Sequence, residues 1–359
     1  MKKEIYIIMI TPELSKDGGG GIANYTQILA KELSLDFEVK RVVTLRERGI
    51  LNRATVLLFA TIKVFYLLST KKRKIAHIHT AHDYSFFRKS IFVKLCKLFK
   101  TPVILHLHSH SFGLSFKNKS HKQQESIRKV FKLADKVIVL HEKEKEWYLD
   151  NIEKRPPLVI YNGMDDLMTS NDKVSQRKNK ILFLGELGHR KGTYDLIKAF
   201  KKVLENHLDA KLILAGDGEI DECKKLVKSL QIDNSIEFLG WIGLERKREL
   251  LNSSKIFVLP SHQESFPLTI LEAMSTRLPI ISTFVGGIPE EIENNVSGVL
   301  INAGDIEALS KNISRLLEDN SLCDTIGQGG RERYLKYFRL NKITKDIENI
   351  YRELYLKEK

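Results

Sequence analysis

The chain is poor in cysteine and contains no low-complexity tract. Its three cysteines, Cys96, Cys223 and Cys323, lie far apart and match no metal-binding spacing. Isolated thiols of this kind are typical of a protein kept reduced in the cytoplasm, and we expect them to be small buried residues. With 42% hydrophobic and 29% charged residues, the composition excludes a largely disordered chain and is that of a globular protein.

The apolar runs are too short for a signal peptide or a clear membrane span. The run at residues 5–10 is shorter than a signal-peptide core, and no cleavage site of small residues follows it. The longest apolar segment, residues 54–70, has 17 residues with Lys63 near its middle. We therefore expect a first strand at 5–10 and a helix of a soluble domain at 54–70.

Acidic residues are scarce in the first half of the chain. Residues 1–165 hold 30 Lys and Arg against 16 Asp and Glu, a net charge of +14, whereas residues 166–359 hold 29 of each kind. Solubility alone would not require this asymmetry, so we expect an anionic partner for the first half. A non-catalytic protein that binds nucleic acid is one alternative. No aromatic-basic motif of the RNA- or DNA-binding kind occurs, and we expect no nucleic-acid partner.

Short β-branched runs alternate with helical stretches throughout, which predicts βα units wound around parallel sheets. The expected strands are 4–10, 37–44, 75–79, 102–107, 136–140 and 158–161, then 180–184, 211–215, 235–239, 255–259, 279–282 and 298–301. The polar stretch after residue 161 breaks the pattern. We expect an α/β protein with two Rossmann-like, doubly wound domains, 1–165 and 166–337, that face a ligand-binding cleft. A C-terminal helix, helical in pattern from 331 and assigned to the first domain from about 338 to 359, would cross back to that domain.

The glycine run "GGGGIANY" follows the first expected strand and opens a helix. Gly20 and Gly21 would let backbone N–H groups approach a phosphate at the positive end of that helix. The G-x-G-x-x-G spacing of a dinucleotide site is absent, so a merely flexible loop is the alternative.

Histidines gather at the ends of two neighbouring strands: His77, His79 and His82 at one, and His106, His108 and His110 at the other. The period of two places the second set on one side of its strand. A metal site is conceivable, but no nearby cysteine or carboxylate completes a ligand set. We favour a substrate-facing histidine, with the others as polar residues of the same rim.

Two segments of the second half suit an anionic sugar derivative. Arg190 and Lys191 end a glycine-bearing loop after a strand, where they are placed to neutralise a diphosphate. In "SHQESFPLTILEAM" a loop with Glu264 leads into a helix with Glu272, and carboxylates accept hydrogen bonds from sugar hydroxyls. The N–H groups of the loop's end could meet donor oxygens, except at the proline. Alternatively, Glu272 could merely stabilise its helix N-terminus.

Taken together, these segments resemble the family 4 retaining glycosyltransferases, or glycosyl transferases group 1, which have the two-domain GT-B fold. The family's most specific motif is a glutamate, seven residues and a second glutamate, and Glu264 and Glu272 match it without gaps. The resemblance spans nearly the whole chain. Weaker matches are Gly20-Gly21-Ile22, His108, "YNGMD", Lys191-Gly192 and "STFVGGIPE".

The resemblance implies an enzyme that binds a nucleotide diphosphate sugar. Glu272 would bind the ribose, Glu264 the hydroxyls of the transferred sugar, and Lys191 the diphosphate. His108 would lie near the reacting sugar and the acceptor, which makes His108 and Glu264 the expected catalytic residues. The other expected donor-binding residues are Gly20, Gly21, Arg190, Phe266, Pro267, Leu268, Gly286 and Gly287.

One position departs from the family pattern. Glu186 stands where the family often has an arginine, so diphosphate binding would depend on Lys191 and Arg190. No Asp-x-Asp metal motif is present, and we expect neither a metal nor another cofactor. Fixed cations and backbone N–H groups would stabilise the departing nucleotide diphosphate. The family retains the anomeric configuration, which implies attack from the same face of the sugar.

The basic N-terminal domain is the expected acceptor domain. Segments 87–100 and 116–132 interleave basic and apolar residues at helical spacing, as on an anionic membrane surface or on a core helix with a solvated basic face. We favour a protein bound to the cytoplasmic face of the plasma membrane, with a lipid-linked saccharide acceptor in capsule or O-antigen assembly. A nucleotide-sugar 2-epimerase of the same fold is the alternative.

Overall fold

The structure, a computed structural model, describes residues 5–12, 21–45, 50–70, 72–109, 111–169 and 173–357. The chain divides into two compact units, here called the N-terminal unit (Met1–Gly163 with Leu340–Lys359) and the C-terminal unit (Met164–Arg339). The boundaries expected from the sequence lie two residues away on each side.

The N-terminal unit contains a parallel sheet in the order β2-β1-β3-β4-β5-β6. Its strands are β1 (Tyr6–Thr11), β2 (Glu38–Val43), β3 (Lys74–Thr80), β4 (Val103–Leu107), β5 (Lys136–Val139) and β6 (Leu158–Val159). Its helices are α1 (Gly21–Leu33), α2 (Ile50–Ser69), α3 (Tyr84–Leu98), α4 (Phe112–Lys117), α5 (His121–Leu133), α6 (Glu142–Asn151) and α14 (Leu340–Lys357).

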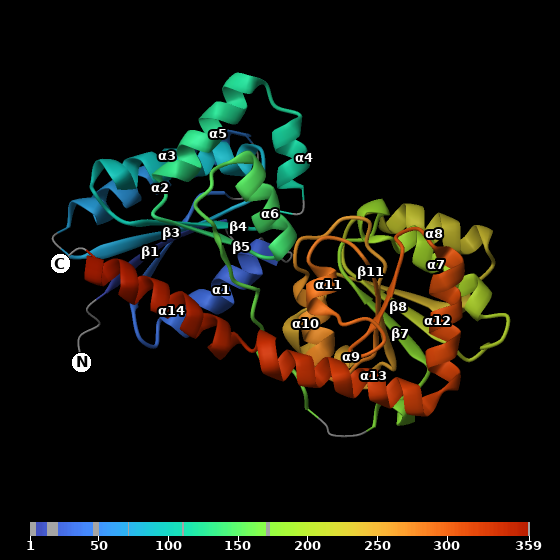
Figure 1. Cartoon of the computed structure of the whole chain (residues 1–359). Coiled ribbons are helices and arrows are strands. Elements are labelled where there is room, and N and C mark those ends of the chain that lie inside the picture. Colours follow the sequence, from blue (N-terminus) through green and yellow to red (C-terminus); the bar gives the residue numbers. More distant parts are fainter. Residues whose placement is uncertain are drawn as a thin grey trace. The chain divides into compact units, whose positions relative to one another are not determined.

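Strands β1, β3 and β4 are buried along their whole length, because helices cover both faces of this sheet. Residues of α2, α3 and α5 pack with alternate strand residues in one apolar core. The C-terminal helix α14 contacts α1 and β3, and these two helices lie on the other side of the sheet in Figure 1. The expected return of the C-terminal helix to this unit is confirmed.

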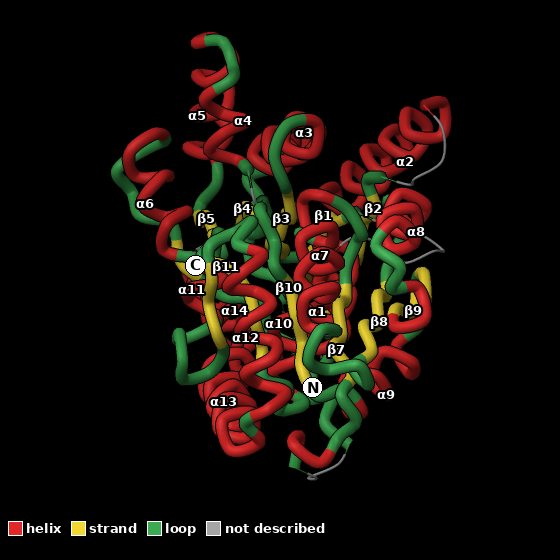
Figure 2. The backbone as a smooth tube through the Cα atoms, turned by 90° about the vertical axis from the view of Figure 1, so that its right-hand side faces the viewer, coloured by secondary structure: helices red, strands yellow, loops and turns green. Residues whose placement is uncertain are grey.

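The C-terminal unit contains a second parallel sheet, in the order β12-β11-β10-β7-β8-β9. Its strands are β7 (Lys180–Leu184), β8 (Lys211–Ala215), β9 (Ile236–Gly240), β10 (Ile256–Leu259), β11 (Ile280–Thr283) and β12 (Val299–Ile301). The α-helices that flank them (Figure 2) are α7 (Thr193–Val203), α8 (Ile220–Ser229), α9 (Leu244–Ser253), α10 (Leu268–Ser275), α11 (Ile288–Glu291), α12 (Ile306–Glu318) and α13 (Asn320–Arg333). Short 3₁₀ turns lie at Val174–Gln176, His189–Lys191 and Asp233–Ser235.

All the expected strands are present, and the α/β class with two doubly wound sheets is confirmed. The expectation of helix from residue 331 to the end is wrong in one place. Helix α13 ends at Arg333, a π-helical turn covers Tyr334–Phe338, and Arg339 is extended before α14 begins. The interruption has a tertiary cause, because the Met164 N–H donates to the Phe338 carbonyl (3.0 Å) and Met164 bridges to Arg339. The backbone there bonds to another segment instead of continuing a helix.

The two basic segments expected on a membrane face are partly buried. In α3, Arg88 and Lys89 are buried, and the Lys89 ammonium donates to the carbonyl of His79. Helix α5 buries its apolar side chains Ile127, Val130 and Phe131 in the core, so the core-helix alternative holds there. Arg88 and Lys89 therefore cannot belong to an exposed basic face. Among the helices that the structure describes, none is long and apolar enough to cross a membrane.

Candidate active site

The loops after β7 and β10 meet where the strand order of the C-terminal sheet reverses. Strand β7 lies between β8, which follows it in the chain, and β10, which does not. At such a point the two connections leave toward opposite faces of the sheet, and ligands of doubly wound proteins bind there. Lys191 ends the loop after β7, and Glu264 lies in the loop after β10. The strand order therefore brings the two predicted residues together.

Lys191 and Glu264 form a buried ion pair. The Lys191 ammonium donates to Glu264 Oε1, and the Ser261 hydroxyl donates to the same oxygen at 3.0 Å. The two charged side chains are only 13% and 8% exposed. A buried pair of this kind loses much of its hydration, so each charge depends on its partner or on a ligand that replaces it.

Backbone contacts fix three loops of the C-terminal unit against one another, those after β7, β10 and β11. The His262 N–H donates to the Arg190 carbonyl at 2.9 Å, and the Gly287 N–H donates to the Ser265 carbonyl at 2.7 Å. Gly286 has a φ of 57° and lies against the backbone of Glu264, where a Cβ atom would collide with the carbonyl oxygen. Glycine is therefore required at 286 by close approach as well as by backbone conformation.

Glu272 lies in the middle of α10 and is 1% exposed. Lys247, on α9, donates to Glu272 Oε1 at 2.6 Å. The other carboxylate oxygen, Oε2, is buried and has no hydrogen-bond partner among the described residues. Because the first turn of α10 holds no acidic residue, stabilisation of the helix N-terminus does not explain Glu272. Glu272 Oε2 thus remains available as a hydrogen-bond acceptor.

Arg190 already has an anionic neighbour within its own loop. Its guanidinium donates to Glu186 at 2.7 Å, the position at which the sequence departs from the family pattern. Both side chains are substantially exposed, so the pair contributes little to stability. Its effect is local, since Glu186 offsets part of the positive charge that Arg190 brings to the site.

Phe266, Pro267 and Leu268 form the entry to α10. Phe266 and Leu268 are buried, and the Phe266 ring contacts Phe338 edge to face at 5.8 Å. Pro267 is extended and precedes the first helical residue, Leu268. The three residues anchor the start of the helix that carries Glu272.

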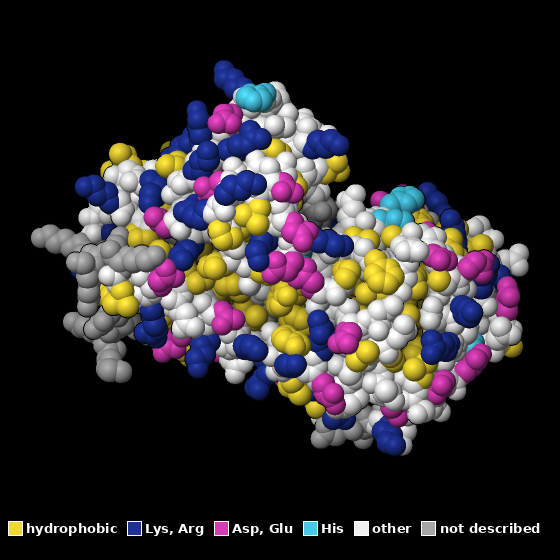
Figure 3. All heavy atoms as spheres, viewed as in Figure 1, with side chains coloured by type: hydrophobic (Ala, Val, Ile, Leu, Met, Phe, Trp, Pro, Cys, Tyr) yellow, Lys and Arg dark blue, Asp and Glu magenta, His cyan; other side chains and the backbone are white. Residues whose placement is uncertain are grey.

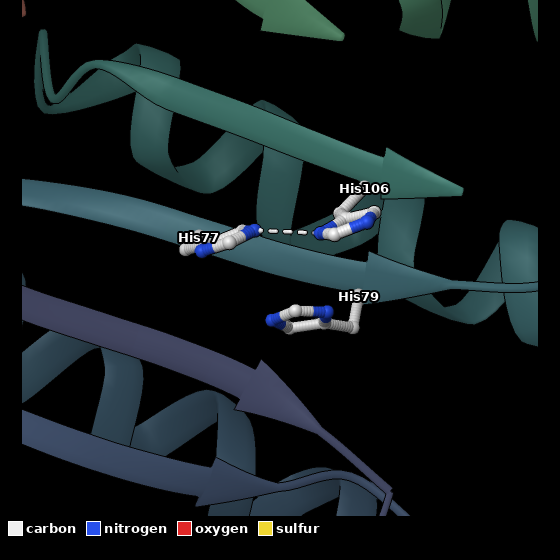
Figure 4. Close-up of side chains that lie close together, drawn as sticks. All are labelled: His77, His79 and His106. Atoms are coloured by element: carbon white, nitrogen blue, oxygen red, sulfur yellow. Dashed lines mark hydrogen bonds between the residues drawn. The ribbon is translucent and has the colours of Figure 1, made fainter. Parts of the chain in front are cut away.

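In the N-terminal unit, four of the expected histidines form one buried cluster: His77 and His79 on β3, His106 on β4, and His108 just after β4. His77 is hydrogen-bonded to Tyr351 Oη (2.6 Å) and to His106 (3.2 Å), and His79 to His108 (2.9 Å). Figure 4 shows His77, His79 and His106 on the two neighbouring strands. The interpretation of His77, His79 and His106 as rim residues is wrong, because all three are completely buried under α1 and α14.

Burial keeps these imidazoles neutral. It lowers the pKa of His77 and of His108 to about 3, and it lowers the pKa of His79 and His106 well below the usual value, with the neighbouring histidines adding to the effect. His108, 7% exposed, therefore offers a neutral imidazole rather than a cation. His82 is partly exposed and bonds to Ser109, whereas His110 lies outside the described residues.

His77, His79 and His106 could each offer a nitrogen to one metal ion, since these atoms lie within 4.8 Å of one another. The lone pair of an imidazole nitrogen lies in the ring plane, but the rings of His77 and His79 are stacked at 4.2 Å. Binding of one ion would require these rings to rotate within a fully buried core.

The expected donor-binding glycines of this unit are Gly20 and Gly21. Gly21 is the exposed first residue of α1, and Gly20 lies outside the described residues.

Comparison with known proteins identifies the family. The family model described as "Glycosyl transferases group 1" matches residues 168–333, and "Glycosyltransferase Family 4" matches residues 19–166. The chain belongs to the group 1 and family 4 glycosyltransferases. As a glycosyltransferase of this family it has the GT-B fold, and the expected family is confirmed. The epimerase alternative finds no support.

Two relatives and one solved structure illustrate the similarity. The glycosyltransferase is 35% identical over 210 residues to N-acetyl-alpha-D-glucosaminyl L-malate synthase of Bacillus anthracis, covering 56% of the chain and 54% of the relative. It is 28% identical over 313 residues to the UDP-Gal:alpha-D-GlcNAc-diphosphoundecaprenol alpha-1,3-galactosyltransferase of Escherichia coli, covering 81% and 78%. The chain spans about half the length of several curated relatives.

Anabaena Alr3699/HepE, solved in complex with UDP and glucose, shares the fold of the glycosyltransferase. The TM-score is 0.78 at 18% identity, with 97% of this chain and 99% of HepE covered.

Two residues of the candidate site escaped the sequence-based prediction. Lys247 lies on a polar helix whose sequence carries no signal for a site. Glu291 is the last residue of α11, the short helix that follows the predicted Gly286 and Gly287. It is completely buried, and neither of its carboxylate oxygens has a hydrogen-bond partner among the described residues. Burial first, and then the nearby Glu264, raises the pKa of the Glu291 carboxyl well above its usual value. The one sequence signal for Glu291 was its place in "GGIPEE", directly after the predicted glycines.

Proposed function

We propose that the protein transfers a sugar from a nucleotide diphosphate sugar to a saccharide acceptor. The observation that carries this proposal is the buried Lys191–Glu264 pair at the point where the strand order reverses. A buried ammonium suits a diphosphate, and the carboxylate beside it suits the hydroxyls of the sugar attached to that diphosphate. Family membership supports the same reaction class.

The proposed donor-binding roles are those that the family resemblance implies, and the chemistry of each side chain is compatible with its role. Lys191 would exchange its carboxylate partner for the diphosphate, which frees Glu264 to accept hydrogen bonds from the transferred sugar. The unpartnered Oε2 of Glu272 would accept a ribose hydroxyl, while Lys247 holds the other oxygen. The remaining proposed donor contacts are Gly21, Arg190, Phe266, Pro267, Leu268, Gly286 and Gly287.

The proposed reaction is retaining and needs no metal. The departing nucleotide diphosphate gains negative charge, and a fixed cation aimed at it supplies what a metal ion supplies elsewhere; one such donor contributes roughly 2.7–4 kcal/mol in comparable sites. The leaving phosphate would take the acceptor proton during attack from the same face. His108, with its neutral imidazole, would hydrogen-bond the reacting groups rather than carry a charge. Transfer should therefore survive EDTA and give an anomer of unchanged configuration.

The proposed acceptor is a lipid-linked saccharide, in the assembly of a bacterial surface polysaccharide such as a capsule or an O-antigen. The name of the E. coli relative, which describes transfer to a diphosphoundecaprenol-linked sugar, supports this choice. The positive charge of residues 1–165 supports binding of the N-terminal unit to the anionic cytoplasmic face of the plasma membrane.

A panel of nucleotide diphosphate sugars tests the donor assignment. One of them should raise the melting temperature, and transfer to a lipid-linked saccharide should then release its nucleoside diphosphate. Glu272→Ala should weaken donor binding, whereas His108→Ala should reduce the transfer rate far more than donor affinity. Formation of an epimer without nucleotide release would overturn the proposal, and equal losses in both properties would make His108 a packing residue.

A further inference from the structure

Helix α2 is apolar on both its buried and its exposed side. One face buries Ala60, Val64, Leu67 and Leu68 in the core. The opposite face carries five large side chains that are 53–70% exposed: Leu58, Phe59, Ile62, Phe65 and Tyr66. Their spacing of one, four, seven and eight positions places them on one side of the helix. A helix that is apolar all round normally has both sides covered, so this exposed face calls for an occupant.

The exposed face of α2 continues onto the end of α3. The Phe65 ring contacts Phe99, just after α3, edge to face at 5.3 Å. Ile91 and Leu98 on α3 are 45% and 77% exposed. We call these seven side chains, the five of α2 with Ile91 and Leu98, the α2–α3 face. It is a patch built by two neighbouring helices rather than a set of scattered apolar residues.

The charge around the α2–α3 face is almost entirely positive. Residues 50–100 contain 11 Lys and Arg and a single acidic residue, Asp83. Three of these basic residues, Lys74, Arg88 and Lys89, are buried and do not contribute to the exposed face. Exposed Lys63 borders the apolar stripe of α2, and exposed Lys94 lies between Ile91 and Leu98 on α3. Lys and Arg side chains are also frequent over α3 and α5 on the face of the N-terminal unit seen in Figure 3. The combination of apolar side chains with a cationic border matches an anionic lipid surface.

A hollow of about 330 Å³ lies beside this face, between α2 and β2. Its lining is Val42, Val43, Val56, Phe59 and Ala60, with the basic residues Arg41 and Lys63. Apolar walls beside cationic groups suit a molecule with an apolar chain and a phosphate. A membrane phospholipid has both.

We propose that the α2–α3 face docks onto an anionic phospholipid bilayer, with α2 lying in the plane of the membrane surface. A second copy of the chain is the competing occupant, but a symmetric pairing would bring two cationic borders together, which is repulsive. This inference deepens the membrane association proposed above: it keeps the exposed side of segment 87–100, adds α2, and leaves out segment 116–132. Vesicle binding needs no sugar donor, so its outcome is separate from that of sugar transfer.

Co-sedimentation of the full chain with vesicles tests the proposal. We compare vesicles of phosphatidylcholine alone with vesicles that also contain about 30% phosphatidylglycerol, so that the two differ in the negative charge of the lipid. Binding should require the anionic lipid. The double variant Phe59→Glu with Ile62→Glu should weaken it at least about tenfold, and Lys63→Glu about fivefold or more. Leu208→Glu, at a side chain 83% exposed in the C-terminal unit, is the matched control and should bind as wild type.

Three results would overturn the inference. Absence of binding to any vesicle removes the membrane association itself. If the α2 variants bind vesicles as wild type does, while Lys122→Glu and Lys129→Glu in α5 lose binding, the membrane-binding surface is on α5 and not on α2. A dimer in light scattering that the α2 variants dissociate makes a second copy the occupant. The melting temperature of every α2 variant without ligand should match that of the wild type, which shows that each remains folded.

Discussion

At the scale of single residues, Lys191 and Glu264 depend on each other. We expect Lys191→Ala to lower the free energy of unfolding by about 3 kcal/mol, because it leaves the Glu264 carboxylate buried without its cation. It should also weaken binding of the nucleotide diphosphate sugar. The measurements are urea denaturation and calorimetric titration.

A second substitution separates these two effects. In the double variant Lys191→Ala with Glu264→Gln no charge is left unpaired, so most of the stability should return while donor affinity stays low. Recovery of both properties would mean that Lys191 serves folding and does not hold the diphosphate.

Glu291 gives a pH-dependent prediction. Burial raises the pKa of this carboxyl well above the usual value, so the folded state keeps a proton that the unfolded state loses above about pH 4.5. The contribution of this carboxyl to the stability of the wild type should therefore fall as pH rises from this value. We expect Glu291→Gln to remove that fall, so its advantage in unfolding free energy should grow between pH 5 and pH 8. Urea denaturation at three pH values measures it.

The exposed Glu245→Gln on α9 is the control for this experiment and should follow the wild type. An advantage of Glu291→Gln that does not change with pH would show that the Glu291 carboxyl is ionised in the folded protein.

At the scale of elements, β3 and β4 carry the buried histidine cluster and with it an acid sensitivity. The lowered pKa values of His77, His79, His106 and His108 mean that the unfolded state takes up protons below pH 6.5 while the folded state does not. Stability is thus full above pH 6.5 and is lost as pH falls. Each histidine contributes up to about 1.4 kcal/mol per pH unit over this range.

Comparing His106→Gln with wild type by urea denaturation at pH 7, 6 and 5 checks this expectation. The variant should lose less stability than wild type between pH 7 and pH 5. Replacement of the exposed His121 by Gln should leave the wild-type slope. Equal slopes in all three proteins would mean that the cluster is protonated or solvated in the folded state.

The elements themselves were largely predictable from local patterns. Alternation of apolar runs with helical stretches identified the strands, because strand and helix periodicity are properties of neighbouring residues. The π-helical turn at Tyr334–Phe338 was not predictable, since it depends on hydrogen bonds with the distant Met164: the Met164 N–H donates to the Phe338 carbonyl, and the Tyr334 hydroxyl donates to the Met164 carbonyl. The burial of Arg88 and Lys89 was also not predictable, because charged side chains are usually exposed. It results from the packing of α3 against β3.

At the scale of the whole molecule, each unit has its own sheet and its own tryptophan. Trp147 packs on Phe112 and Phe116 in the N-terminal unit, and Trp241 is 54% exposed in the C-terminal unit. Trp241→Phe leaves a reporter for the first unit, and Trp147→Phe leaves one for the second. At a donor concentration of 100 times Kd, binding adds about 2.7 kcal/mol to the state that binds.

We expect thermal unfolding followed by Trp241 fluorescence to shift upward with donor more than unfolding followed by Trp147. We expect this difference because the C-terminal unit is the proposed binding site of the donor. A larger shift in the Trp147 signal would assign the donor to the N-terminal unit and contradict the roles of Lys191 and Glu272.

The sequence by itself determined the two doubly wound sheets, the glutamate pair of the 261–274 segment and the positive charge of the first half, because each is written in neighbouring residues or in simple counts. Only the tertiary structure decided which residues meet. Glu264 pairs with Lys191 across 73 positions, Glu272 pairs with Lys247, and His77, His79 and His106 stack out of reach of solvent. These contacts depend on the order of strands in a sheet and on which helix covers which face, and long-range packing sets both.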